Sequence, residues 1–189
     1  MTDSLDVARR ESALSSGAGF PFLLCFGVTW ILAAVSSFVV AQTTAAWIHL
    51  LQGVVVMPVA VGLQRLLGYP RASRDNPLMP LAAQIVFIQP VAFPAFIVVL
   101  GLEPAYVPVA FAAVVAAHFL PFGWLYRTPV YVVLGVVLSA GVFGLAAVFG
   151  LRSLHYTGFF VGACLLVAAF FARAHAAALR RQTVTGTAA

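Results

Sequence analysis

Charged residues are rare along this chain, and the stretches between them are long. Only seven charged side chains lie between Glu11 and Arg173, and they leave five long uncharged runs of 53, 27, 23, 24 and 20 residues. A helix needs about 20 apolar residues to cross a bilayer core of about 30 Å. Each of the four shorter runs therefore predicts one crossing, and the first run, residues 12–64, is long enough for two. The pattern predicts an all-α fold, a polytopic membrane protein built as a bundle of six transmembrane helices.

Polar clusters, glycine and proline set the expected helix boundaries. A Gln-Thr-Thr cluster at residues 42–44 divides the first run, and Glu103-Pro104 marks a tight turn. Asn76-Pro77 is typical of a helix N-cap followed by proline at the first helical position. The expected helices span residues 17–41, 45–67, 77–101, 105–126, 129–150 and 154–173. We expect a single transmembrane domain, residues 17–175, between a polar N-terminal segment, residues 1–16, and a C-terminal tail, residues 176–189.

The basic residues predict the orientation. All ten are arginine. Nine of them lie at helix ends on one side of the predicted bundle, and Arg152 alone lies on the other side. Because cytoplasmic loops of membrane proteins carry the excess of basic residues, both termini should be cytoplasmic. We expect a multi-pass protein of the bacterial cytoplasmic membrane.

Composition agrees with a chain embedded in lipid. Hydrophobic residues make up 63% of it and charged residues 8%, against about 45–50% and 25% in soluble domains. The net charge of +5 raises the question of nucleic acid. The arginines form no basic stripe with interleaved aromatic residues, however. The sequence predicts the lipid bilayer as a partner and no nucleic acid.

His118 is the clearest polar residue inside an expected helix. It shares one helix face with Phe122 and Tyr126, which follow at i+4 and i+8. Pro121 cannot donate a hydrogen bond to the carbonyl of Ala117 and should bend the helix. A polar group inside the membrane is costly, so this face could bind a proton, an ion or a polar ligand. The alternative is a histidine that hydrogen-bonds across the bundle and fixes helix packing.

The expected helix over residues 77–101 carries two glutamines and two internal prolines. Pro90 and Pro94 each free a backbone carbonyl, and interrupted helices of this kind line binding sites in transporters. Gln84 and Gln89 do not form one polar stripe, and a bent packing helix would explain them too. We expect the His118 face to point into the bundle against this helix. The candidate ligand-binding residues are His118, Gln84, Gln89, Tyr126 and Trp124.

A second group of polar residues is expected near the outer surface. Its members are Glu103, Arg152, His49 and His155. They could form a small polar vestibule, with Glu103 and Arg152 close together, or they could reflect ordinary interfacial solvation. Gly158 and Gly162 form a GxxxG pattern that favours close helix packing, within the bundle or between protomers of a homo-oligomer.

The sequence contains no phosphate loop, no dinucleotide fingerprint and no pair of His or Cys residues at metal-ligand spacing. We therefore predict no catalytic residue, no cofactor and no metal. Whether the chain is an enzyme stays open, with a non-enzyme favoured.

Residues 70–135 carry a recognisable set of motifs. They are Asp75-Asn76-Pro77-Leu78, Gln84, Gln89-Pro90, Glu103-Pro104-x-Tyr106-x-Pro108 and Ala117-His118-Phe119-Leu120-Pro121-x-x-Trp124-Leu125-Tyr126. This segment resembles a family of small multi-pass bacterial membrane proteins known only as a domain of unknown function. The resemblance implies a bacterial membrane protein of about six helices and implies no activity, cofactor or catalytic residue.

The sequence leaves three functions open. The leading hypothesis is an integral membrane protein that binds, senses or transports a small solute between the third and fourth expected helices, which makes it a possible transporter. The first alternative is a structural or accessory membrane subunit without its own ligand. A lipid-modifying membrane enzyme is the third.

Overall fold

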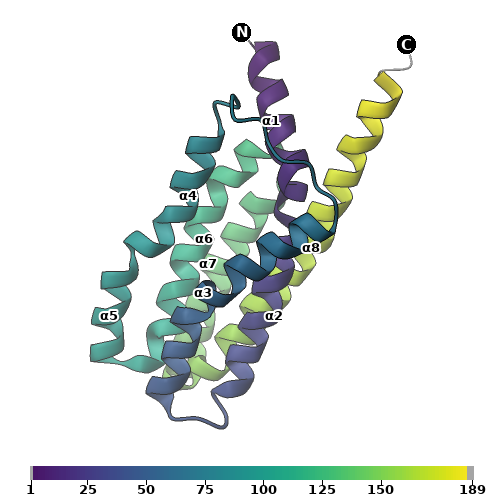
Figure 1. The fold of residues 1–189 in the computed structure, drawn as a ribbon. Coiled ribbons are helices and arrows are strands. Elements are labelled where there is room, and N and C mark those ends of the chain that lie inside the picture. Colours follow the sequence, from purple (N-terminus) through teal and green to yellow (C-terminus); the bar gives the residue numbers. More distant parts are fainter. Residues whose placement is uncertain (1, 187–189) are drawn as a thin grey trace.

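The computed structural model describes residues 2–186, and within that range every regular element is helical. Figure 1 shows the helices gathered into one elongated bundle. In chain order they are α1 (Thr2–Ser16), η1 (Gly17–Gly19), α2 (Phe20–Ser36), α3 (Gln42–Leu66), α4 (Met79–Val91), α5 (Phe93–Leu102), η2 (Pro104–Tyr106), α6 (Val107–Leu125), α7 (Val130–Phe149), η3 (Gly150–Arg152) and α8 (Ser153–Gly186). The all-α prediction is confirmed for this part of the chain.

Five helical stretches in residues 2–186 are long and apolar enough to cross a membrane. They are Ser4–Ser36, Gln42–Leu66, Met79–Leu102, Pro104–Leu125 and Val130–Gln182. The sequence predicted six crossings, and the difference lies in the last stretch. There α7 and α8 are separated only by the 3-10 turn η3, so they count as one stretch, although the two helices pack against each other.

The boundary between α1 and α2 differs from the prediction. Three consecutive residues, Gly17, Ala18 and Gly19, have positive φ angles of 60°, 49° and 81°. Two of them are glycines, for which this conformation costs little. A side chain at Gly17 would meet the ring of Tyr69, and one at Gly19 would meet the hydroxyl of Tyr131. The expected helix over 17–41 therefore begins only after this break, and the polar segment before it is helical too.

Proline divides the expected helix over residues 77–101. α4 ends at Val91 and α5 begins at Phe93, with a one-residue turn at Ala92, between Pro90 and Pro94. A proline has no backbone N–H to donate to the preceding turn. Pro90 and Pro94 therefore each remove one helical hydrogen bond, on either side of Ala92. The helix also begins two residues later than predicted. Asn76 acts on the loop instead, where its Oδ1 accepts a hydrogen bond from the backbone N–H of Leu78 at 3.0 Å.

Close packing of α2 on α8 forms the centre of the bundle. A Cβ at Gly158 would lie 2.7 Å from the carbonyl oxygen of Trp30, and one at Gly162 would lie 2.7 Å from that of Gly27. Both glycines are buried, so the GxxxG pattern serves helix packing within the chain. A homo-oligomer stays a prediction, and the contacts of Gly158 and Gly162 described here are with α2 of the same chain.

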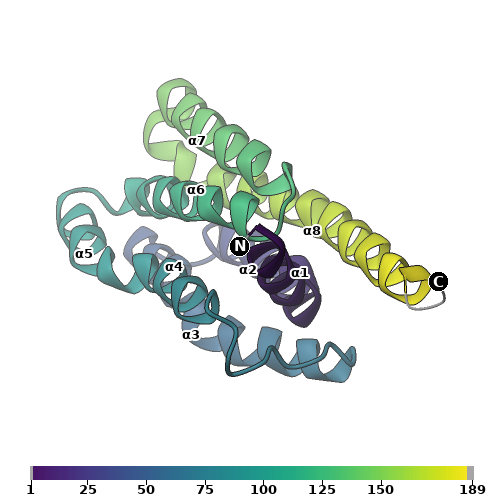
Figure 2. The ribbon, with the colours of Figure 1, turned by 90° about the horizontal axis from the view of Figure 1, so that it is seen from above.

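The other helices are arranged around this pair. α7 packs against both α6 and α8, while α3 packs against α2. Viewed from above, α4 and α5 lie beside α6 at one side of the bundle (Figure 2). The first and last described residues lie at the same end of the molecule, where the end of α8 diverges from the bundle (Figure 1). Residues 176–186 of the predicted tail are part of α8, and residues 187–189 lie outside the described range.

Candidate functional site

A cavity of about 630 Å³ lies between α2, α3, α4 and α6. This volume falls within the range of about 300–1,000 Å³ that is usual for small-molecule sites. α3 packs mainly on α2, and α4 packs mainly on α6. α3 and α4 therefore lie on either side of the cavity and do not pack closely against each other. The end of α1 and the loop of residues 69–72 complete the wall.

Each helix gives the cavity one face, at the spacing expected of a helix. On α6 the lining residues recur mostly at intervals of three or four, with one adjacent pair, and α2 shows the same pattern. Most of them are aromatic or aliphatic. The lining includes Phe22, Leu23, Phe26 and Trp30 from α2, Met57 and Val61 from α3, Met79, Ala82, Ala83, Val86 and Phe87 from α4, and Phe111, Val115, Phe119, Phe122 and Leu125 from α6.

A glutamine and a histidine form the polar pair of the cavity. His118 on α6 and Gln89 on α4 both line it. The Nδ1 of His118 lies 2.7 Å from the carbonyl oxygen of Val115. If Nδ1 of His118 donates to that carbonyl, Nε2 of His118 carries a lone pair and can accept a hydrogen bond. The amide nitrogen of Gln89 lies 3.4 Å from this Nε2 and is the donor. The expected orientation of the His118 face, into the bundle and against the helix over 77–101, is confirmed.

The other predicted ligand-binding residues are divided by the fold. Tyr126 is buried and lines the cavity. Gln84 on α4 is exposed and is not among the residues that line the cavity. Trp124 is also exposed outside the cavity. The structure therefore brings His118, Gln89 and Tyr126 together around one space.

Two aromatic residues of the lining were not anticipated as site residues. Trp30 is 1% exposed and stacks on Phe111 with ring centroids 5.3 Å apart. Tyr131 donates its hydroxyl hydrogen to the carbonyl oxygen of Ala18, at 2.5 Å, and so ties α7 to the break before α2. The sequence could not identify Trp30 as a cavity residue, because it does not show which face of an apolar helix lacks a neighbouring helix.

Charge in the lining is confined to two arginines. Arg65, near the end of α3, and Arg71, in the loop after it, both line the cavity and are both exposed. No acidic residue is among the lining residues. Within the described chain, neither guanidinium forms an ion pair. The charged part of the lining is therefore positive.

The loop over the cavity is held against α1 by a buried asparagine. The Nδ2 of Asn76 lies 3.0 Å from the carbonyl oxygen of Ala8 and 2.9 Å from Oε2 of Glu11. Oε1 of the same glutamate accepts the backbone N–H of Ser73. From α3, Gln64 donates to the carbonyl oxygen of Ser15 at 2.7 Å. These bonds fix α1 as part of the cavity wall.

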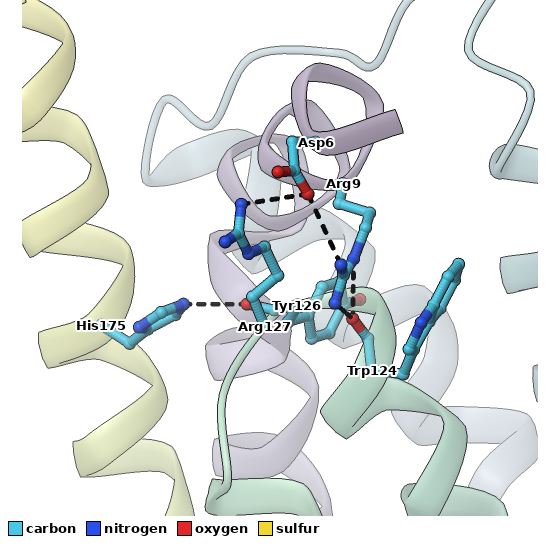
Figure 3. A network of polar contacts seen from close by, with 6 residues as sticks. All are labelled: Asp6, Arg9, Trp124, Tyr126, Arg127 and His175. Carbon is cyan, nitrogen blue, oxygen red and sulfur yellow. Dashed lines mark hydrogen bonds and ion pairs between the residues drawn. The ribbon is translucent and has the colours of Figure 1, made fainter. Parts of the chain in front are cut away.

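A network of polar contacts fastens the start of α1 to the end of α6 (Figure 3). Asp6 pairs with Arg127 at 3.1 Å and with Arg9 at 3.6 Å. Arg9 also donates to the carbonyl oxygen of Trp124, and its guanidinium lies 4.6 Å from the centre of the indole ring. From α8, Nε2 of His175 donates to the carbonyl oxygen of Tyr126 at 2.9 Å. Trp124, a predicted ligand-binding residue, thus takes part in docking α1.

The predicted outer polar cluster is not assembled as one site. Glu103 accepts a hydrogen bond from Gln42 at 2.8 Å, and within residues 2–186 it forms no ion pair with Arg152, which is exposed. Nδ1 of His155 lies 2.8 Å from the hydroxyl of Ser37.

His49 lies inside the bundle, fully buried, where its Nδ1 contacts the carbonyl oxygen of Ala45 at 2.9 Å. Its ring meets that of Trp30 edge-on, with centroids 5.4 Å apart. The described residues also contain no group of three His, Cys, Asp or Glu side chains placed to hold a metal ion. Glu103, His155 and His49 thus each have a separate partner, and within residues 2–186 no hydrogen bond or ion pair joins the four predicted residues to one another.

Comparison with protein families gives one assignment. The model of a family of unknown function, DUF7010, matches residues 5–175, so the chain belongs to this family. The match extends well beyond residues 70–135, on which the resemblance was based. No curated protein and no solved structure matches the chain.

Proposed function

Because the family has no known activity, we propose a function from the cavity itself: the protein binds a small solute between α3, α4 and α6, to sense it or to transport it. The observation that carries the proposal is the Gln89–His118 pair facing an otherwise apolar space of about 630 Å³. Binding sites for small molecules are typically apolar pockets with a few convergent polar groups. His118 and Gln89 meet this description, and Tyr126 adds a third polar group.

The membrane arrangement is part of the proposal. We place α7 and α8 in the bilayer as separate crossings, which gives six in one transmembrane domain. Support comes from the packing of α7 against α8 and from the two described chain ends, which lie at the same end of the molecule. The arginine distribution would set that end in the cytoplasm of a bacterial cell. The cavity then opens near the cytoplasmic surface and reaches inward to Gln89.

Gln84 supports a second function. It is exposed on α4 among apolar side chains, and an amide facing acyl chains is costly. A partner helix on this face would give the amide a hydrogen bond, as an accessory subunit would require. Gln84→Leu would then weaken a complex without affecting solute binding. The third alternative, a lipid-modifying enzyme, has less support, because no acidic residue lines the cavity.

Thermal unfolding of the purified protein tests the binding function. The probes are a panel of carboxylates, amines, alcohols and amides of similar size, added singly, since a ligand that binds only the folded state raises the unfolding temperature. Ala82→Phe places a ring in the cavity lining, whereas Ala140→Phe places the same ring on an exposed face of α7. We expect at least one probe to stabilise the native protein and Ala140→Phe but not Ala82→Phe. Equal stabilisation of both variants, or no stabilisation by any probe, would contradict the proposal.

A further inference from the structure

We infer that the ligand is a single-chain amphipathic anion, with its hydrocarbon chain in the cavity and its anionic head group at Arg65 and Arg71. The inference rests on the binding function proposed above and names the chemical class of its ligand. It follows from a contrast within one site. The lining is mostly apolar and most of its polar side chains already have partners, while both of its charged residues are arginines.

The interior offers few hydrogen bonds to a ligand. Most polar side chains of the lining already bond within the protein, and the occupied hydrogen bonds include Ser12 to Ala8 O (2.9 Å), Ser15 to Ser12 O (3.1 Å), Gln64 to Ser15 O (2.7 Å) and Tyr131 to Ala18 O (2.5 Å). A polar solute would lose its hydration without gaining equivalent bonds. A hydrocarbon chain loses nothing and gains about 25 cal/mol per Å² of buried apolar surface.

The opening favours an anion. Arg65 and Arg71 have no acidic partner in the described chain, whereas Arg9 and Arg127 share Asp6. A guanidinium matches a carboxylate in planar geometry and binds it through two parallel hydrogen bonds. Next to a low-dielectric membrane, the attraction between such charges is stronger than in bulk water. A cationic head group would be repelled by both arginines.

The walls suggest a lateral route for the chain. Three lining residues of α4 have exposed side chains: Met79 at 39%, Val86 at 39% and Phe87 at 62%. We place the lateral opening between α3 and α4, which both line the cavity and are not among the closely packed helix pairs. A single-chain lipid can slide from the membrane into this opening while its head group stays at the surface, near Arg65 and Arg71.

Trp30 is a natural reporter of occupancy. Of the three tryptophans, it alone is buried and lines the cavity, while Trp47 and Trp124 are exposed. In a Trp47→Phe/Trp124→Phe protein, Trp30 is the only emitting tryptophan. A brominated chain quenches its fluorescence only on contact, which requires the chain to enter the cavity. The probes are octadecanoate, octadecanol, octadecyl-trimethylammonium and a two-chain phosphatidylglycerol, all brominated in mid-chain and added to phosphatidylcholine vesicles.

We expect saturable quenching by octadecanoate at a pH that keeps it ionised, and at least about tenfold weaker binding of the alcohol and the ammonium compound. Arg65→Gln combined with Arg71→Gln should lower octadecanoate affinity about tenfold. Arg74→Gln is the matched control, because Arg74 is an exposed arginine of the same loop that does not line the cavity. It should leave the affinity unchanged.

The possible failures are distinguishable. Quenching of equal affinity by the alcohol or the ammonium compound would overturn the anionic assignment and leave the binding function standing. Tighter quenching by the two-chain phospholipid would overturn the single-chain assignment. Equal losses in Arg74→Gln and in the double variant would remove the role of Arg65 and Arg71. If no probe quenches Trp30 saturably, both the ligand class and the accessibility of the cavity to lipid-like solutes are wrong.

Discussion

His118 shows how one residue can serve packing and binding together. One ring nitrogen contacts the carbonyl of Val115 in its own helix, and the ring also meets Gln89 on α4. The structural and functional readings of this histidine are therefore compatible. The first uses the bonds to protein, and the second uses the face that the pair presents to the cavity.

Replacement of His118 by leucine should affect both properties. It removes the bonds to Gln89 and to the carbonyl of Val115, so we expect a loss of about 1–2 kcal/mol in the free energy of unfolding. Ligand-dependent stabilisation should disappear as well. Denaturant unfolding in detergent, with and without a stabilising probe, measures both effects. In the control His155→Leu, which loses the contact with Ser37 outside the cavity, the probe should still stabilise the protein. If it also stabilised His118→Leu fully, the site would not involve this residue.

Asn76 fixes the loop over the cavity. Its side-chain Nδ2 donates to Ala8 and Glu11 of α1, and its side-chain Oδ1 accepts the backbone N–H of Leu78. We expect Asn76→Ala to destabilise the protein by about 1–3 kcal/mol, because buried polar partners lose their bonds. Hydrogen exchange should also accelerate in residues 69–78. Asp75→Ala, a change at an exposed neighbour, should do neither. Unchanged exchange in the Asn76 variant would show that this side chain does not hold the loop.

At the level of elements, the contact between α2 and α8 depends on two glycines. A methyl group at Gly162 would lie 2.7 Å from the carbonyl oxygen of Gly27, a backbone atom that cannot move aside alone. Gly162→Ala should therefore cost about 1–3 kcal/mol through overpacking. Gly144, on α7, has nothing within 4 Å of such a methyl group, so Gly144→Ala should stabilise by about 0.5–1 kcal/mol through helix propensity. Equal effects in thermal unfolding would contradict the packing account.

The sequence predicts the long helices well because lipid imposes a simple requirement. An uncharged run of about 20 residues must be helical, since its backbone has no other partners in the bilayer. The sequence also predicted that Pro90 and Pro94 interrupt or bend the helix, although not that the break lies at Ala92. The left-handed break at residues 17–19 was harder to predict, because Ala18 has a positive φ, a conformation that alanine disfavours. Tertiary contacts of Tyr69 and Tyr131 accompany it, and the sequence does not reveal them.

The site was predicted only where two helices were considered together. The sequence placed the His118 face against the helix over 77–101 without choosing between its two glutamines, and in the structure Gln89 contacts His118. Gln84 has the same residue type but lies on the outer face, since five residues turn a helix by about 140°. His49 illustrates the opposite error. It sits near an expected helix end, yet the core encloses it completely.

At the scale of the whole molecule, six crossings with both ends on one side form a testable topology. We expect reporter fusions after Ala189 to be cytoplasmic, and insertions at residues 42–44, 101–103 and 152–155 to be external. The reason is the nine-to-one distribution of arginines across the bundle. Alkaline phosphatase activity marks external positions and a fluorescent protein marks internal ones. An active phosphatase after Ala189 would mean an odd number of crossings or an inverted protein.

Binding in the cavity is the central claim, and native mass spectrometry of the detergent-purified protein tests it most directly. The spectrum would be recorded for the native chain, for Ala82→Phe, whose ring occupies the lining, and for Ala140→Phe, whose ring lies on exposed α7. The account predicts a small-molecule adduct on the native protein and on Ala140→Phe, and its absence from Ala82→Phe. A folded native protein without any adduct after incubation with the stabilising probe, or an adduct retained equally by Ala82→Phe, would contradict it.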